Sequence, residues 1–180
     1  MEIVADLHLH TVATKHAFST VQENARAASE KGLYAIAITE HGPAMLDAPP
    51  WYFFKNLLVV PDELFGVRIL KGCEVNVLSY RGNLDMQANV LAPLDWVVAS
   101  FHKGILHPKT AEEHTKGHLA VAENPYIDVI GHCGQEAFPF DHEKVVKAFK
   151  EYGKIVEVNA SPSLAASISA ETAPGMWPSA

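Results

Sequence analysis

Short apolar runs alternate with amphipathic runs along most of this chain, and that alternation constrains its fold more than any other feature. The apolar runs have the length of strands and predict strands at residues 3–8, 34–39, 67–74, 95–100, 127–131 and 155–159. Capped amphipathic runs predict helices at residues 21–31, 110–123 and 141–152. A strand followed by a helix, repeated several times, predicts an α/β fold with a parallel sheet and right-handed crossovers.

The composition is that of a folded globular protein. The chain has 180 residues, of which 48% are hydrophobic and 19% are charged, and this is enough for one domain with a hydrophobic core. A net charge of −7 disfavours binding to nucleic acid, which needs a basic surface. Apolar runs such as residues 33–38 are too short to cross a membrane, and the first residues do not resemble a secretory signal. We therefore expect a cytoplasmic protein.

The chain divides into one long domain and a short tail. We expect residues 1–160 to form the domain, and residues 161–180, which are rich in Ser, Ala and Pro, to be disordered. Residues 44–61 form a longer connection whose aromatic cluster at 51–54 we expect to pack rather than to cover a site. Cys73 and Cys133 are too few for a disulfide framework, so we expect two buried or half-buried free thiols.

Residues that could bind a metal follow each of the first five predicted strands. Successive members of this series are 28 to 33 residues apart, close to the length of one βαβ repeat. The carboxyl ends of parallel strands converge on one face of an α/β barrel, where active sites of that architecture lie. The series is His8, His41, Glu74, His102 and His132.

Two further histidines extend this series. His8 and His10 form an H-x-H motif, whose side chains point the same way on an extended segment, and His16 follows in the next loop. Six imidazoles with one carboxylate and no cysteine suit Zn²⁺, Mn²⁺ or Fe²⁺ better than Mg²⁺ or Ca²⁺. The remaining histidines lie away from strand ends and are interpreted as surface residues, although the i, i+4 pair could bind a metal adventitiously: His107, His114, His118 and His142.

Several of these segments resemble the motifs of one family. DLHLHT at residues 6–11, TEHGP at 39–43 and the CE pair that ends in Glu74 are followed by SFH, which ends in His102, and GH, which ends in His132. In this order and spacing they resemble the PHP family, named for polymerase and histidinol phosphatase. The resemblance covers residues 1 to about 160 and is strongest to stand-alone, single-domain bacterial phosphatases.

The resemblance implies a distorted seven-stranded TIM-like barrel that holds up to three metals and hydrolyses phosphoesters. By position, His8, His10 and Glu74 would hold a first metal. Glu74 would bridge to a second, completed by His102 and His132, while His16 and His41 would hold a third. Metal-bound hydroxide would attack the phosphorus in line, without a separate protein base. A substrate phosphate could contact the basic residues Lys15, Arg68 and Lys103.

The sequence departs from the family pattern at three places. Glu40 stands where the family usually has Asp, and Cys133 stands where it commonly has Pro. The family also carries a late Asp-x-His pair, which the repeat would place at about residue 190, beyond Ala180. We therefore expect a barrel without its final βα unit, whose unpaired strand edges invite association into a homo-oligomer.

Three functions remain open at this point. The first is a metal-dependent phosphoesterase that acts on a small phosphorylated metabolite. The second is a truncated remnant of that fold that binds metal weakly and has little or no activity. The third is a hydrolase of the amidohydrolase type, which shares the H-x-H motif but normally needs a bridging lysine and has no role for His16 or His41.

Overall fold

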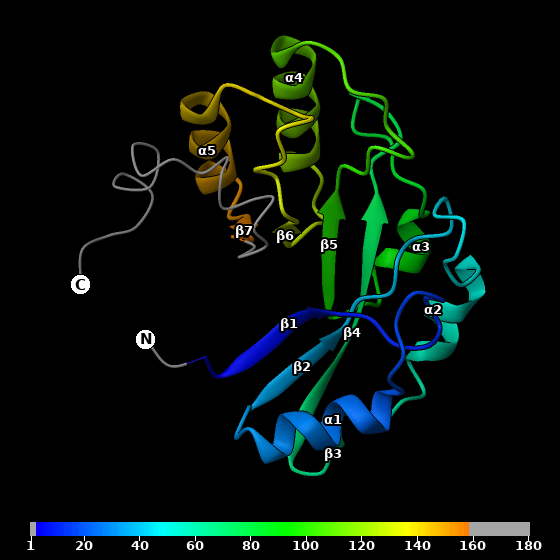
Figure 1. The fold of residues 1–180 in the computed structure, drawn as a ribbon. Coiled ribbons are helices and arrows are strands. Elements are labelled where there is room, and N and C mark those ends of the chain that lie inside the picture. Colours follow the sequence, from blue (N-terminus) through cyan, green and yellow to red (C-terminus); the bar gives the residue numbers. More distant parts are fainter. Residues whose placement is uncertain (1–2, 159–180) are drawn as a thin grey trace.

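The computed structural model describes residues 3–158 and shows a parallel sheet flanked by helices (Figure 1). Six parallel strands follow the order β1-β2-β4-β5-β6-β7, and the short β3 pairs antiparallel with β4. The strands are β1 (Ala5–Leu9), β2 (Ala35–Ile38), β3 (Glu63–Leu64), β4 (Val67–Asn76), β5 (Trp96–Ser100), β6 (Val129–Ile130) and β7 (Ile155–Val156). This α/β sheet forms a distorted, partial barrel, which confirms the predicted fold class. The expected tail at 161–180 lies outside the described residues.

The three predicted helices are present, together with two that were not predicted. The helices are α1 (Val21–Glu30), α2 (Trp51–Leu57), α3 (Ala88–Leu91), α4 (Ala111–Ala122) and α5 (His142–Glu151). Helix α1 begins at a complete capping box between Thr20 and Glu23, a feature that stabilises a helix start by about 1 kcal/mol. The unpredicted helices α2 and α3 are short, and their N-cap residues, Pro50 and Gln87, make no side-chain capping bond in the structure. None of the helices in the described residues is long and apolar enough to cross a membrane.

Strand β4 joins two parts of the sheet. Its first half, residues 68–71, pairs with β2, and its second half, residues 72–76, pairs with β5. Gly72 lies at this change of partner, where a Cβ atom would be only 2.5 Å from the carbonyl oxygen of Trp96. Glycine therefore lets the neighbouring strands approach β4 closely enough for the sheet to curve.

Two apolar cores cover the outer face of the curved sheet. Helix α1 packs on the β2 side, and α4 and α5 lie beside the β5–β7 side (Figure 1). The smaller core includes Ala25, Ala28, Ile36, Ile38, Val67 and Ile69. The larger core includes Phe54, Val75, Val97, Phe101, Val121 and Phe149. Because both cores lie outside the sheet, its inner face is free to carry polar groups.

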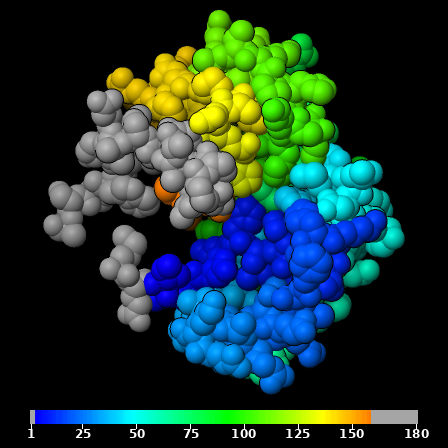
Figure 2. All heavy atoms as spheres, in the orientation of Figure 1, coloured from blue at the N-terminus to red at the C-terminus, as the bar shows by residue number. Residues whose placement is uncertain are grey.

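The sheet path ends at β1 and at β7, which do not pair with each other in the described residues. A groove of about 780 Å³, here called the seam, lies between them and is lined by residues that include Leu7, His8, Trp96, Ile155 and Glu157. The indole N–H of Trp96 donates to the carbonyl oxygen of Leu7 at 2.9 Å and so ties β5 to β1. In Figure 2 the blue N-terminal segment lies directly beneath the yellow segment near residue 130, so the two ends of the sheet face each other across the seam.

Candidate metal centre

Glu74 lies at the centre of the polar inner face because of the alternation along β4. Cys73 and Val75 point into the larger apolar core, so Glu74 and Asn76 point to the opposite face. The Glu74 side chain is completely buried. A buried carboxylate is costly unless charged or hydrogen-bonding groups surround it.

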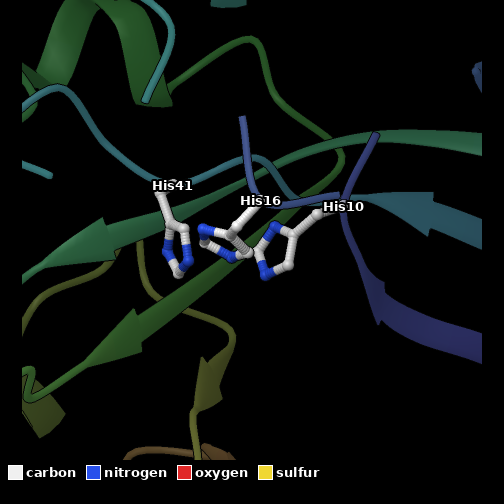
Figure 3. Close-up of side chains that lie close together, drawn as sticks. All are labelled: His10, His16 and His41. Carbon is white, nitrogen blue, oxygen red and sulfur yellow. The ribbon is translucent and has the colours of Figure 1, made fainter. Parts of the chain in front are cut away.

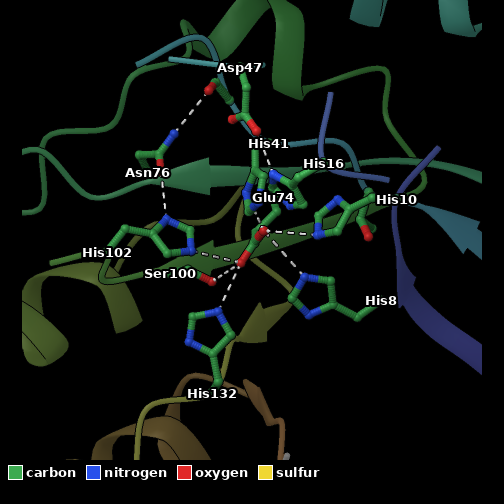
Figure 4. A network of polar contacts seen from close by, with 12 residues as sticks. His8, His10, His16, His41, Asp47, Glu74, Asn76, Ser100, His102 and His132 are labelled. Atoms are coloured by element: carbon green, nitrogen blue, oxygen red, sulfur yellow. Dashed lines mark hydrogen bonds and ion pairs between the residues drawn. The ribbon is translucent and has the colours of Figure 1, made fainter. Parts of the chain in front are cut away.

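Imidazoles from four separate segments surround this carboxylate (Figure 4). Oε1 lies 3.0 Å from Nε2 of His132 and 3.3 Å from Nε2 of His102. Oε2 lies 2.6 Å from Nδ1 of His41, 3.4 Å from Nε2 of His8 and 3.6 Å from Nε2 of His10. The structure thus brings together five of the six predicted histidines around one carboxylate, with different imidazoles facing each oxygen.

Ser100 and Gly131 complete the environment of the Glu74 carboxylate. The Ser100 hydroxyl donates to Oε1 at 2.6 Å, from the end of β5. A Cβ on Gly131 would lie 2.3 Å from that hydroxyl oxygen, so a larger residue there would displace it. Gly131 therefore allows the end of β6 to approach β5 while His132 reaches the same carboxylate.

The sixth histidine, His16, lies beside His10 and His41 rather than against Glu74 (Figure 3). Its ring centroid is 5.2 Å from that of His41 and 5.9 Å from that of His10. Its side chain is 54% exposed, and its Nδ1 lies 2.5 Å from Oδ2 of Asp47. His16 thus belongs to the outer, solvent-facing part of the cluster.

The cluster contains three groups of side chains whose ligand atoms lie within 4.8 Å of one another, close enough to hold a metal ion. The groups are His8, His10 and Glu74; His41, Glu74 and His102; and His10, His16 and His41. The first equals the set implied for a first metal by the family resemblance. The other two differ from the implied sets because His41 joins Glu74 and His102, and His10 joins His16 and His41.

The contact between His41 and Glu74 supports the fit of a metal. Nδ1 of His41 and Oε2 of Glu74 are buried and 2.6 Å apart, yet neither has a hydrogen-bond partner of acceptable geometry in the described structure. Nδ1 of His10 is also buried without a partner. Buried polar atoms are normally satisfied, so atoms left like this suit a site that holds a cation. Imidazole nitrogen and carboxylate oxygen are the ligands that Zn²⁺ and related ions take.

The electrostatics of the cluster depend on the shared carboxylate. Burial would raise the pKa of Glu74, but contacts with His102, His132, His41 and His8 outweigh burial and hold that pKa well below its usual range. Burial also opposes a charged His8, yet Glu157 and Glu74 raise the pKa of this imidazole to about 10. The pKa of His10 falls to about 4 through burial and the positive charge of His41. The cluster therefore combines a firmly ionised carboxylate with imidazoles of very different basicity.

The sequence analysis missed the groups that orient these rings. Nδ1 of His102 lies 2.7 Å from the Asn76 amide oxygen, and Nδ1 of His132 lies 2.7 Å from Gln135. Asp47 and Glu157 contact Nδ1 of the remaining two oriented rings, His16 and His8. Asn76 and Glu157 could have been found by extending the strand-end rule to positions two residues after Glu74 and at the sixth strand. Asp47 and Gln135 lie in loops, where the sequence offers no such signal.

The unusual residue Glu40 bonds to the first motif rather than to His41. Its Oε1 accepts the backbone N–H of Thr11 at 2.9 Å and the Thr11 hydroxyl at 2.5 Å. The other departure, Cys133, is a partly buried free thiol whose pKa burial raises to about 11, and Cys73 is a buried free thiol. These findings confirm the expectation for both cysteines.

Three predictions about residues near the cluster have different outcomes. Lys15 and Lys103 are exposed residues of the loops that carry His16 and His102, and their contact with a substrate stays a prediction. Arg68 was a wrong choice, because it pairs with Ala35 at the opposite end of the strands from Glu74.

The prediction that His114 and His118 are surface residues was also wrong. They are 0% and 2% exposed, because α4 packs that face against the larger core and α5. His107 and His142 are exposed, as predicted.

A partial α/β barrel with a buried carboxylate ringed by imidazoles defines a class of candidate metal-dependent proteins. Within that class, the sequence matches the PHP domain family over residues 6–161, and the chain belongs to this family. It is 54% identical over 159 residues to a protein of Acetivibrio thermocellus named "Probable phosphatase", covering 88% of this chain and 66% of that protein. A protein of Clostridium novyi, also named a probable phosphatase, is 48% identical over 89% of this chain and 66% of its own length. The chain thus spans slightly less than two thirds of these relatives.

A solved structure has the same fold. The crystal structure of histidinol phosphate phosphatase from Lactococcus lactis, in complex with zinc, L-histidinol and phosphate, aligns with a TM-score of 0.57. The alignment covers 86% of this chain and 72% of that chain at 17% sequence identity. At this identity the likeness shows the fold alone.

Proposed function

We propose that this protein is a metal-dependent phosphoesterase that hydrolyses the monoester of a small phosphorylated metabolite. The observation that carries the proposal is the Glu74 carboxylate, which is completely buried and faces different imidazoles with each of its two oxygens. The names of the relatives, and the zinc and phosphate in the related crystal structure, support this choice. The site would take two to three divalent ions, with zinc, manganese and iron as the candidates.

Each part of the site has a distinct task in this proposal. Glu74 would bridge two cations, since Oε1 faces His102 and His132 while Oε2 faces a second set of rings. His16, in the outer part of the cluster, would help to hold a further cation near the solvent. Divalent cations in such a centre supply an activated water and stabilise the charge of the transferred phosphoryl group. Lys15 and Lys103 would attract the phosphate of the substrate from the rim.

The position of Lys71 disfavours an amidohydrolase. Such a site normally needs a lysine that bridges the metals, but Lys71 lies on β4 with its Nζ against the carboxylate of Asp62. Alternation along β4 places Lys71 on the face opposite Glu74. The bridging position is instead taken by Glu74 itself.

The proposal is tested by assaying purified protein on p-nitrophenyl phosphate after addition of Zn²⁺, Mn²⁺ or Fe²⁺, and after removal of metal with a chelator. We expect hydrolysis that is lost with the chelator and restored by one of the ions. Metal binding at Glu74 without hydrolysis would instead favour the alternative, a PHP-type domain that binds metal but has no activity. Neither metal binding nor hydrolysis would contradict the proposal outright.

A further inference from the structure

Glu157 contacts residues on both sides of the seam. It follows β7 directly, and its backbone N–H donates to the carbonyl oxygen of Ile130 at 3.0 Å, which fixes it to β6. A single carboxylate oxygen, Oε2, lies 3.0 Å from Nδ1 of His8 and accepts the backbone N–H of His132 at 2.9 Å. Glu157 is therefore linked both to the ring on β1 and to the turn after β6.

His8 needs a contact of this kind because its strand holds it weakly. In the described residues β1 pairs with β2 alone, and its register is irregular between Asp6 and Leu9, the stretch that contains His8. The contact from Glu157 to Nδ1 turns Nε2 of the ring toward Oε2 of Glu74, 3.4 Å away. A carboxylate on Nδ1 also favours the tautomer whose Nε2 lone pair is free to bind a cation.

His132 depends on the same oxygen in a different way. Its backbone has a positive φ of 26°, a conformation that residues other than glycine rarely adopt. This turn brings Nε2 of His132 to 3.0 Å from Oε1 of Glu74. By accepting the His132 N–H, Glu157 stabilises the turn, while Gln135 holds the ring at Nδ1.

The partners of the other rings show what is particular to Glu157. His102 and His132, which face Oε1 of Glu74, have neutral amides at Nδ1, from Asn76 and Gln135. Among the rings that contact Glu74, His8 has a carboxylate at Nδ1. A negatively charged partner makes an imidazole a stronger ligand than a neutral partner does.

We propose that Glu157 is a positioning residue of the metal centre: it orients His8 and the turn at His132 so that both face Glu74 from opposite sides of the seam. This inference rests on the proposed metal-dependent function. It adds a charged residue that holds two of the ligand-bearing segments in place across the unpaired ends of the sheet.

The test compares Glu157→Ala and Glu157→Gln with a control, Glu151→Gln, which changes an exposed glutamate at the end of α5. Zn²⁺ affinity is measured on metal-free protein by competition with a chromophoric chelator. We expect Glu157→Ala to bind Zn²⁺ roughly 10- to 100-fold more weakly, the usual effect of removing the partner of a ligand histidine. Glu157→Gln, which can still accept both hydrogen bonds, should recover part of that loss, and the control should match the wild type.

Two further readouts separate positioning from a general loss of structure. The visible spectrum of the Co²⁺-loaded protein should change in Glu157→Ala while its circular dichroism does not. In metal-free protein, the His132 amide should exchange with deuterium faster in Glu157→Ala than in the wild type. An Ala variant with wild-type Zn²⁺ affinity and spectrum, or with unchanged exchange at His132, would overturn the inference. A wild-type protein that binds no Zn²⁺ would instead refute the proposed function, because the exchange measurement still tests the Glu157 contact.

Discussion

The molecule contains two groups of buried histidines with opposite surroundings. In the first group, five rings surround the Glu74 carboxylate. In the second, His118 on α4 stacks on Phe101 with ring centroids 4.2 Å apart and planes 6° apart, next to Phe140 and Phe149. Neither ring nitrogen of His118 has a hydrogen-bond partner in the described structure.

The difference shows what a carboxylate does to a buried imidazole. Burial among aromatic rings lowers the pKa of His118 to about 3, so this residue stays neutral. His114 beside it is satisfied as a neutral ring, since its Nδ1 faces the Pro139 carbonyl oxygen at 2.7 Å and its Nε2 accepts the Lys109 N–H at 2.8 Å. His8 is also largely buried, yet its two carboxylate neighbours raise its pKa to about 10. We therefore assign His114 and His118 to the stability of the fold and the Glu74 group to metal binding.

The largest effect should come from removing the charge of the shared carboxylate. Glu74→Gln keeps the size of the side chain but leaves the imidazoles without their anion, so we expect Zn²⁺ affinity to fall by more than about 100-fold, beyond the loss typical of an outer contact. Hydrolysis should be lost with it. Chelator competition and the p-nitrophenyl phosphate assay measure the two effects.

The matched control for this variant is Glu30→Gln, at the exposed end of α1. It should bind Zn²⁺ as the wild type does. If Glu74→Gln bound Zn²⁺ as well as this control, the assignment of the Glu74 group to metal binding would be wrong.

A smaller and opposite effect is expected in the second group. His118→Ala leaves a cavity among aromatic rings, so the free energy of unfolding should fall by about 2–4 kcal/mol, as for other large-to-small changes in a core. The Zn²⁺ affinity of the folded variant should stay near that of the wild type. Urea denaturation and chelator competition give the two values.

His102→Ala is the converse variant. It should weaken Zn²⁺ binding strongly and change the stability of metal-free protein by less than about 1 kcal/mol, because the ring is at the rim of the site and not in the core. Equal effects of the two variants on both measurements would remove the distinction between the groups.

The smallest effect concerns the pH dependence of stability. The unfolded chain binds a proton at His118 near the ordinary histidine pKa of 6.5, whereas folded His118 binds one only near pH 3. This group therefore destabilises the fold as the pH falls through that window, by up to about 1.4 kcal/mol per pH unit. His118→Leu lacks this contribution, so its free energy of unfolding should fall less steeply between pH 6 and pH 4.

The measurement is urea denaturation of metal-free wild type and His118→Leu at several pH values. His8 contributes in the other direction: its raised pKa gives stability that is present below pH 6.5 and lost as the pH rises through about 10. Because His8 is present in both proteins, its contribution cancels in the comparison. Parallel curves for the two proteins would show that His118 is not buried as a neutral ring.

The sequence predicted much of the fold because the strands and the long helices carry local signals. The caps at Thr20, Thr110 and Asp141 mark the starts of α1, α4 and α5, and all three are observed. Strands β6 and β7 are shorter than predicted, since an apolar run does not show where pairing stops. The short helices α2 and α3 had no such signal in side-chain capping.

The same division holds for the site. The five strand-end residues could be placed because parallel strands end on one face, a rule that depends on spacing alone. The burial of His114 and His118 could not, because it depends on what packs against α4, including the close approach of Tyr80 at Gly117. The contacts of Asp47 with His16 and of Glu157 with His8 join residues far apart in the chain, so local patterns do not contain them.

The most direct test of the central claim is anomalous diffraction at the zinc edge from crystals of this protein grown with Zn²⁺. We predict anomalous peaks within about 2.0–2.2 Å of the Glu74 carboxylate oxygens and of the surrounding imidazole nitrogens. Peaks confined to other surfaces, with none near Glu74, would contradict the account.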